Sequence, residues 1–435
     1  MSSSGSNMST PASTPPGTPS ASSATPPPTI QRKRRGMGVW IAVAVVIVVI
    51  VIVVGLGVGL GWFKTSSSSK ASTACGPGST ATSAPGATDF KGEGSTLVAP
   101  LMDQWATSYG NGAQLTYDPA GSSSGVTAIT DKVVDFGASD YPLTTTQLNA
   151  IPGVVTIPES VGAVVPIYYV PGIVYPTGVS SLNFNGSVLA QMFDGTITNW
   201  NNPALQALNP GVSFPTATIL PVHRTGGSGT TFIFTSFLTA DSSAWASSYG
   251  KSPVWPTTIT VGTSASGNGG EADTVGTTPD TLGYVDLNYA LNSASSVGIG
   301  NVQNPSLAFI RASVVDTVSA LHDLSPTLPT GTQTWYNVSY LNAPGKTDYP
   351  IVGLTYILTY SDLSSAFSSY SLANAENLVD FIHWAITVGQ SWSAPLYYAP
   401  ISSGLLSIDN ATLNSFTFSG ASIPVCVPTS GSAPA

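Results

Sequence analysis

The chain has 435 residues, of which 42% are hydrophobic and only 8% are charged, against about 25% charged in an average soluble domain. Its 12 basic and 21 acidic residues give a formal net charge of −9, and it has two cysteines and three histidines. This composition excludes a basic nucleic-acid-binding protein, a disulfide-stapled miniprotein and a cysteine-rich metal protein. We therefore expect no nucleic-acid partner, no metal and no other cofactor.

The first segments predict a membrane tether. Residues 1–35 are rich in Ser, Thr, Pro and Gly and are predicted to be a disordered cytoplasmic tail. Residues 36–63 contain no charge and, as a helix, are long enough to cross the ~30 Å hydrocarbon core. The basic cluster at residues 32–35 places the amino terminus in the cytoplasm and the folded part outside the cell. A cleaved signal peptide is the alternative.

Residues 64–88 form a second segment rich in Ser, Thr and Gly and are predicted to be a flexible stalk. Cys75 lies in this stalk and Cys426 lies near the carboxyl end. An oxidising compartment permits a disulfide between them, and two unpaired thiols are the alternative.

The remaining residues, from 89 onward, hold 21 acids against six bases, a formal net charge of −15. Short apolar runs alternate there with helix-like segments, which is typical of α/β units with a largely parallel sheet. We expect the low charge density to suit acidic or otherwise harsh surroundings, as in some archaeal extracellular proteins.

Three turns with the same composition precede predicted helices, at residues 92–96, 121–125 and 226–230. Each combines glycine with Ser or Thr, so backbone N–H groups, a hydroxyl and the positive end of a helix could face one anion. A single turn of this kind is more simply explained as a helix cap. Three such turns, together with Arg224 in a part of the chain that has few bases, predict a shared oxyanion site.

The sequence resembles a known family in five stretches: GEGSTLVAPLMDQW, AGSSSGVTAITDKVVDFGASDYPL, NWNNPALQALNPGVSFP, HRTGGSGTTFIFTSFL and TLGYVDLNYAL. In this order and spacing they are similar to the phosphate-binding protein of the phosphate ABC transporter, the PstS family. The resemblance is dense from Gly92 to Leu291. It implies a two-lobed type II periplasmic-binding-protein fold that binds inorganic phosphate between α/β lobes and delivers it to permease subunits, without being an enzyme.

By this resemblance eight positions contact the ligand: Thr96, Leu97 through its amide, Ser122, Asp140, Arg224, Ser228, Gly229 and Thr230. Two positions depart from the family pattern. Leu97 stands where the family has an aromatic residue, and Gly226 replaces the acidic residue that usually partners the arginine, so Arg224 is expected to be less firmly oriented.

The residue types suit phosphate. Arg224 offers a planar fork for two oxygens and keeps its charge at any relevant pH. Hydroxyls and amides replace the water that a buried dianion loses. The Asp140 carboxylate can accept a hydrogen bond from the proton of hydrogen phosphate, whereas sulfate has no proton to donate and would be repelled. Without the resemblance, a capping or surface role would be the simpler explanation of Asp140.

The resemblance also implies where the lobes lie. The chain is expected to cross between lobes near residues 168–171 and again near residues 349–353. Lobe one is then residues 89–170 with 350–430, and lobe two is residues 171–349.

Parts of the sequence are also compatible with other classes of function. Residues 121–125 match G-x-S-x-G, so a serine hydrolase with Ser123 as nucleophile and His322 or His383 as base is an alternative. The glycine-rich run at residues 262–270 lacks the ending of a P-loop and is predicted to be a loop. A structural surface protein and a receptor for another oxyanion, such as sulfate or molybdate, also stay open.

Overall fold

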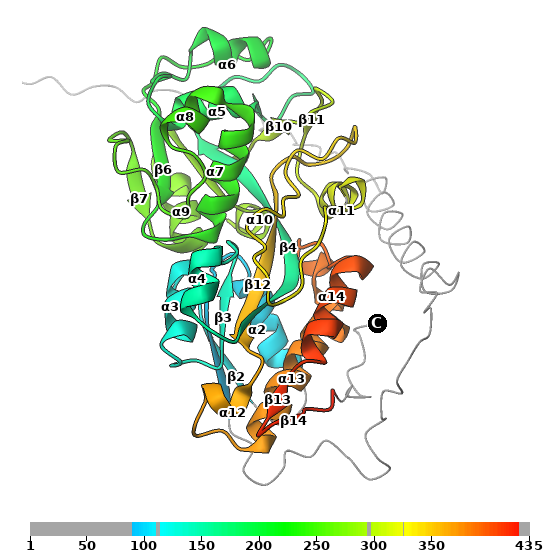
Figure 1. The fold of residues 1–435 in the computed structure, drawn as a ribbon. Helices are drawn as coiled ribbons and strands as arrows, with labels where there is room; N and C mark the ends of the chain where they lie inside the picture. Colours follow the sequence, from blue (N-terminus) through cyan, green and yellow to red (C-terminus); the bar gives the residue numbers. More distant parts are fainter. Residues whose placement is uncertain (1–88, 110–113, 294–296, 325, 426–435) are drawn as a thin grey trace, which may run out of the picture. The chain divides into compact units, whose positions relative to one another are not determined.

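The computed structural model describes residues 89–425 except 110–113, 294–296 and 325 (Figure 1). The expected tail at 1–35, membrane span at 36–63 and stalk at 64–88, together with Cys75 and Cys426, lie outside the described residues. Within those that are described, no helix combines the length and the apolar character needed to cross a membrane.

One sheet of nine strands runs through the described part of the chain, in the order β2-β1-β3-β12-β4-β8-β6-β7, with β9 paired to β4. Its members are β1 (Phe90–Gly94), β2 (Leu115–Asp118), β3 (Phe136–Ser139), β4 (Val154–Tyr169), β6 (Leu220–Arg224), β7 (Thr263–Ala265), β8 (Thr281–Asp286), β9 (Gly298–Ile299) and β12 (Val352–Tyr360). A small sheet of three strands comprises β5 (Asn183–Phe184), β10 (Asn301–Gln303) and β11 (Phe309–Ile310). A sheet of two strands comprises β13 (Thr417–Phe418) and β14 (Ala421–Ser422).

The main sheet is mixed. Strand β1 is parallel to β2 and β3, and β6 is parallel to β7 and β8. The central strands β12 and β4 are antiparallel to each other and to their outer neighbours β3 and β8. The expected largely parallel sheet is therefore correct for the two flanks and wrong for the centre, where the chain returns between the flanks.

Strand β4 belongs to both halves of the sheet. Its residues up to Ala163 pair with β12, and those from Val164 onward pair with β8. All but its last residue are buried, as expected of a strand with both faces covered. Close to this change of partner, Gly162 of β4 lies opposite Gly353 of β12. The two halves are thus joined by continuous strands, which agrees with the expected two-lobed architecture.

The helices cover the faces of both halves (Figure 1). Many begin at a Ser, Thr, Asn or Asp whose side chain accepts a backbone N–H, as Ser228 does for α7 and Ser371 for α13. They are α2 (Ala99–Ser108), α3 (Ser122–Thr130), α4 (Thr145–Ala150), α5 (Gly186–Phe193), α6 (Pro203–Leu208), α7 (Gly229–Asp241), α8 (Ser243–Ser248), α9 (Gly267–Thr277), α10 (Leu287–Asn292), α11 (Val314–Asp323), α12 (Leu363–Ala366), α13 (Leu372–Ile386), α14 (Ser403–Leu413), and the short 3₁₀ helices η1 (Val388–Trp392) and η2 (Ala394–Leu396).

Each half has its own aromatic cluster. On one side, the ring of Phe381 lies 5.0 Å from that of Phe90 and 6.5 Å from that of Trp105. On the other side, Phe234 stacks on Tyr284 with ring centres 4.3 Å apart. Large buried aromatic side chains contribute most of the hydrophobic stabilisation of such cores, and both clusters belong to one continuous hydrophobic core.

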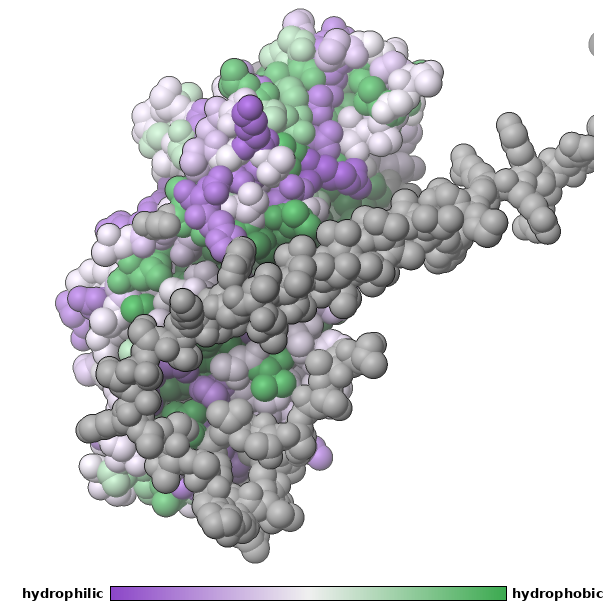
Figure 2. Space-filling view, turned by 90° about the vertical axis from the view of Figure 1, so that its right-hand side faces the viewer, coloured by the Kyte–Doolittle hydropathy of each residue, from purple (hydrophilic) through white to green (hydrophobic). Residues whose placement is uncertain are grey.

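The surface reflects the composition. On the face shown in Figure 2, most visible residues are of intermediate hydropathy, with strongly hydrophilic and hydrophobic residues scattered among them. This agrees with a chain in which only 8% of the residues are charged.

Candidate functional site

The first glycine-containing turn links β1 to α2. Gly94 ends the strand with φ 145°, and a Cβ there would lie 2.0 Å from the carbonyl oxygen of Ala138, so only glycine fits. Thr96 and Leu97 follow as buried residues. The amide of Leu97 donates to Ser95 Oγ at 2.9 Å, so this expected ligand donor already has an internal partner.

The second turn links β2 to α3. The amide of Gly121 donates to the carbonyl oxygen of Gly94 at 2.7 Å, which ties this turn to the first one. Ser122 begins α3, and its Oγ accepts from the amides of Asp140 at 3.2 Å and Gly229 at 3.1 Å. It also donates to Asp140 Oδ2 at 3.3 Å. Ser122 therefore connects the second turn to β3 and to the start of α7.

The third turn links β6 to α7 and lies against the second. The amide of Ser123 donates to the carbonyl oxygen of Gly227 at 3.2 Å. Ser228 caps α7 by accepting from Thr231, and Gly229 is the first residue of that helix. A Cβ on Gly229 would lie 2.3 Å from Asp140 Cβ, so Asp140 packs directly on this helix start. The three junctions that the sequence predicted to converge do meet at one place.

Arg224, at the end of β6, is 3% exposed and points its guanidinium into this place. Its Nη2 donates to Thr96 Oγ1 at 3.0 Å and its Nη1 to Thr230 Oγ1 at 3.4 Å. Its Nε lies 4.0 Å from Oε2 of Glu271. The two terminal nitrogens thus reach hydroxyls of the first and third turns, as a fork around a shared anion requires.

Asp140 follows β3 and is also buried. Burial raises its pKa to about 6, although Arg224 and neighbouring hydroxyls oppose the shift. Its Oδ1 makes no hydrogen bond within the described part of the chain. A buried carboxylate with such an oxygen can accept a hydrogen bond from a protonated ligand, which is the role that the resemblance implies for Asp140.

All eight predicted ligand positions lie at or beside these three junctions, and two further residues were missed. Asn268 Nδ2 donates to Thr96 Oγ1 at 3.0 Å and to Thr230 Oγ1 at 3.1 Å. Glu271, one turn farther along the same helix, faces Arg224. Both belong to α9, which begins inside the run at residues 262–270.

The prediction of a loop at residues 262–270 was therefore wrong. Residues Thr263–Ala265 form β7, and α9 begins at Gly267. The φ of Gly267 is 67°, a left-handed conformation that favours glycine. The run is a fourth strand-to-helix junction of the same kind as the other three, and its Gly-Asn-Gly sequence was the signal that could have identified it.

Several other carboxyls are buried near the site. Glu159 Oε1 accepts from Thr355 Oγ1 at 2.7 Å, and burial raises the pKa of Glu159 to about 8. Asp286 caps α10, and burial raises its pKa well above the usual range. Arg224 provides the one ion pair found within the described part of the chain. The protonated forms of these carboxyls are therefore favoured by burial.

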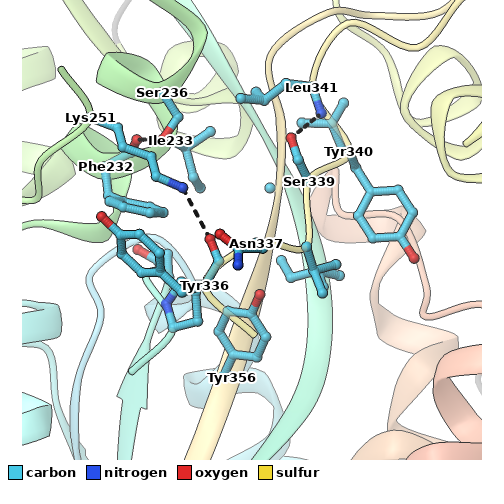
Figure 3. A pocket seen from close by; sticks show the side chains of 16 residues that line it. Phe232, Ile233, Ser236, Lys251, Tyr336, Asn337, Ser339, Tyr340, Leu341 and Tyr356 are labelled. Atoms are coloured by element: carbon cyan, nitrogen blue, oxygen red, sulfur yellow. Dashed lines mark hydrogen bonds between the residues drawn. The ribbon is translucent and has the colours of Figure 1, made fainter. Parts of the chain in front are cut away.

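A cavity that is lined in part by Asp140 lies between α7 and the segment around Tyr340 (Figure 3). Lys251 Nζ donates there to the carbonyl oxygen of Tyr336 at 3.1 Å and lies 4.0 Å from the centre of its ring. The lysine is thus held by an internal carbonyl and an aromatic face. Phe232 and Tyr356 complete the aromatic lining.

The arrangement around Ser123 differs from a hydrolase elbow. Ser123 Oγ lies 2.9 Å from the hydroxyl of Tyr141, and no described hydrogen bond joins it to a histidine. His322 is in α11 and His383 in α13. No group of three or more potential metal ligands occurs among the residues whose positions are described.

Comparisons with known proteins agree with this geometry. Residues 79–387 match the PBP superfamily domain. The phosphate-binding protein PstS of Haemophilus influenzae is 32% identical over 327 residues, which cover 74% of this chain and 91% of that protein. The PstS of Xylella fastidiosa and that of Methanocaldococcus jannaschii are each 30% identical, over 73% and 71% of this chain and 82% and 80% of their own lengths.

Solved structures show the same fold. A high-affinity periplasmic phosphate-binding protein, PfluDING, crystallised with phosphate, superposes with a TM-score of 0.60 at 16% identity over 75% of this chain and 98% of its own. A phosphate-binding protein from Stenotrophomonas maltophilia gives a TM-score of 0.59 at 19% identity over 74% and 93% of the two chains.

Proposed function

The chain belongs to the PstS family of the PBP superfamily, and from this premise we propose that it binds inorganic phosphate between its two lobes. Membership in a family of binding proteins agrees with the expectation that the chain is not an enzyme. The proposed receptor would deliver phosphate to the permease subunits of an ABC transporter.

The convergence of the three turns on Arg224 carries this proposal. Thr96, Thr230 and Ser122 supply hydroxyls from three different elements, and all are buried. A buried dianion needs a donor for each of its oxygens because it has lost its water. Arg224 supplies charge at the same point, and its fork fits two oxygens of one tetrahedral group.

Asp140 gives the proposed site its selectivity. With a pKa of about 6, its carboxyl is ionised at neutral pH and can accept a hydrogen bond from the protonated oxygen of hydrogen phosphate. Sulfate would instead bring only lone pairs toward that carboxylate and be repelled. Since the site discriminates by a proton, arsenate, which also carries one, would bind in the same way.

We also propose the location of the receptor. The folded part lies outside the cell, tethered by a membrane-spanning helix at residues 36–63 with its amino terminus in the cytoplasm. Lobe one would comprise residues 89–170 with 350–430, and lobe two residues 171–349. Strand β4, which pairs with β12 and then with β8, is the connection that such a division requires.

Calorimetry with phosphate, sulfate, arsenate and molybdate tests the function. Removing a buried charge-assisted contact typically costs about 2–5 kcal/mol, so Arg224→Ala should weaken phosphate binding roughly 30- to 5,000-fold. Arg311→Ala is the matched control, since Arg311 is exposed and bonds only Ser181 Oγ among the described contacts. Failure of the parent to bind phosphate, or equal effects of the two substitutions, would refute the proposal. Preferential binding of sulfate or molybdate would assign the site to that anion.

A further inference from the structure

We propose that Glu271 is the residue that orients Arg224 toward the ligand, in place of the acidic residue that the family has two positions after the arginine. This inference rests on the proposed function and concerns how the same site is held. Glu271 is thereby a positioning residue, since it lies behind the guanidinium and acts on phosphate only through Arg224.

The Glu271 carboxyl and the Arg224 guanidinium face each other, and no other described group bonds the two facing atoms. Glu271 Oε2 and Arg224 Nε are 4.0 Å apart, and neither atom has a hydrogen-bond partner in the described part of the chain. Glu271 is fully buried and Arg224 nearly so. Two unpaired polar atoms in such a place are costly, and an approach of about 1 Å would turn them into a charge-assisted hydrogen bond.

The carboxyl is itself held in place. Its other oxygen, Oε1, accepts from the amide of Tyr284 at 2.8 Å. Tyr284 belongs to β8, and its hydroxyl accepts from the amide of Arg224 at 3.3 Å. The rigid sheet therefore fixes both Glu271 and the backbone of the arginine that it faces.

The direction of the contact leaves the ligand-binding nitrogens available. Glu271 lies on the Nε side of the guanidinium, whereas Nη1 and Nη2 reach Thr230 and Thr96 on the other side. Because the guanidinium is planar, holding one edge fixes where the opposite fork points. An acid contacting Nη1 or Nη2 would instead compete with phosphate.

The position that the family uses cannot serve here. Gly226 has no side chain, its φ is 73°, and a Cβ built on it would have no neighbour within 4 Å. The turn at that point is open and contributes nothing to holding Arg224. Glu271 reaches the guanidinium from α9, so the acid has a different origin in the chain.

The elements packed against α9 carry several charged or titratable residues. Arg224 lies in β6, Tyr284 and Asp286 lie in β8, and Tyr289 lies in α10. Burial raises the pKa of Glu271 to about 8, whereas Arg224 and the Tyr284 amide oppose the shift. Among these neighbours only Arg224 carries a positive charge, so it is the natural partner of the Glu271 carboxylate.

Glu271→Gln provides the test because glutamine has nearly the same shape but one oxygen. The Tyr284 amide takes that oxygen, which turns the NH₂ group toward Arg224 Nε and places donor against donor. Loss of this buried ion pair, with a donor placed against a donor, predicts phosphate affinity lower by about tenfold or more, measured by calorimetry at pH 8.5. Asp409→Asn is the matched control: Asp409 is a fully buried carboxyl in α14, remote from these residues in the chain, and should leave affinity within about twofold.

A double-mutant cycle separates orientation from a general structural effect. Lysine at position 224 has no Nε edge to hold, so Glu271→Gln should cost less than about twofold in an Arg224→Lys background. An equal cost in both backgrounds, or no cost in the parent, would overturn the inference. If Glu271→Gln does not fold, Glu271→Asp, which keeps the charge but withdraws it by one methylene, should show the same coupling.

The outcomes also separate this inference from the function it rests on. A parent that does not bind phosphate, or an Arg224→Lys variant that binds it as well as the parent, would contradict the proposed function. Phosphate binding that depends on Arg224 but not on Glu271 would contradict only the orienting role.

Discussion

Replacing Glu159 by glutamine should make the protein more stable at alkaline pH and leave it almost unchanged at acidic pH. Glu159 is fully buried in β4, its Oε1 accepts from Thr355, and its Oε2 has no partner in the described part of the chain. Glutamine keeps the accepting oxygen and the shape. It removes only the carboxyl group that ionises.

The sign and size follow from linkage. Burial raises the pKa of Glu159 from 4.5 in the unfolded chain to about 8 in the folded one. Between pH 4.5 and about pH 8 the folded state therefore binds a proton that the unfolded state has lost. The stabilisation from this proton is full below about pH 4.5 and is lost as pH rises through about 8. At about 1.4 kcal/mol per pKa unit the full difference is roughly 5 kcal/mol, an upper limit because water can enter.

Urea unfolding of parent and Glu159→Gln at pH 5, 7 and 9 measures the effect. We expect the variant to match the parent at pH 5 within about 1 kcal/mol and to exceed it by at least about 2 kcal/mol at pH 9. Glu376→Gln is the control, since Glu376 lies in α13 and is only partly buried. Parallel pH curves for parent and Glu159→Gln would refute the argument that burial holds this carboxyl in its protonated form.

Three further predictions concern the site. Asp140→Asn should lower the ratio of phosphate to sulfate affinity by about tenfold or more, because an amide can donate a hydrogen bond to sulfate. A variant that discriminates like the parent would refute the role of Asp140 as the acceptor of a hydrogen bond from phosphate. Gly229→Ala should weaken phosphate binding at least tenfold, since its Cβ would lie 2.3 Å from Asp140 Cβ; unchanged calorimetry would mean that the site has more room than described. Raising the salt concentration from 0.05 to 0.5 M should change phosphate affinity less than about threefold, because buried donors are little screened, and a steep decline would point to surface charge instead.

The sequence was informative where local chemistry and structure coincide. Each of the turns at residues 92–96, 121–125 and 226–230 combines glycine with a hydroxyl residue, and that pattern predicted both a helix start and an anion site. Their repetition beside Arg224 predicted a shared site, but not which atoms meet there, because the contacts between Ser122 and Gly229 and between Thr96 and Arg224 span more than 100 residues of chain.

The two residues that were missed show the limit of this approach. Asn268 lies in the glycine-rich run at residues 262–270 and Glu271 directly follows it. That run was predicted to be a loop because it lacks the ending of a P-loop, yet its second half begins α9, which packs on β8. The mixed centre of the sheet was missed for a related reason. Strand β4 is buried on both faces, and such a run does not reveal whether its neighbours are parallel or antiparallel.

The glycine pair beside the change of partner in β4 has a mechanical consequence. Gly162 and Gly353 oppose each other in the ladder, and a Cβ on them would lie 2.8 Å from Leu97 and 2.3 Å from Ile233. Because no side chain stiffens either strand there, torsion of one half of the molecule relative to the other would concentrate at these two residues. The paired strands would then twist reversibly at this point rather than rotate freely, and a bulky residue at either position would prevent the twist.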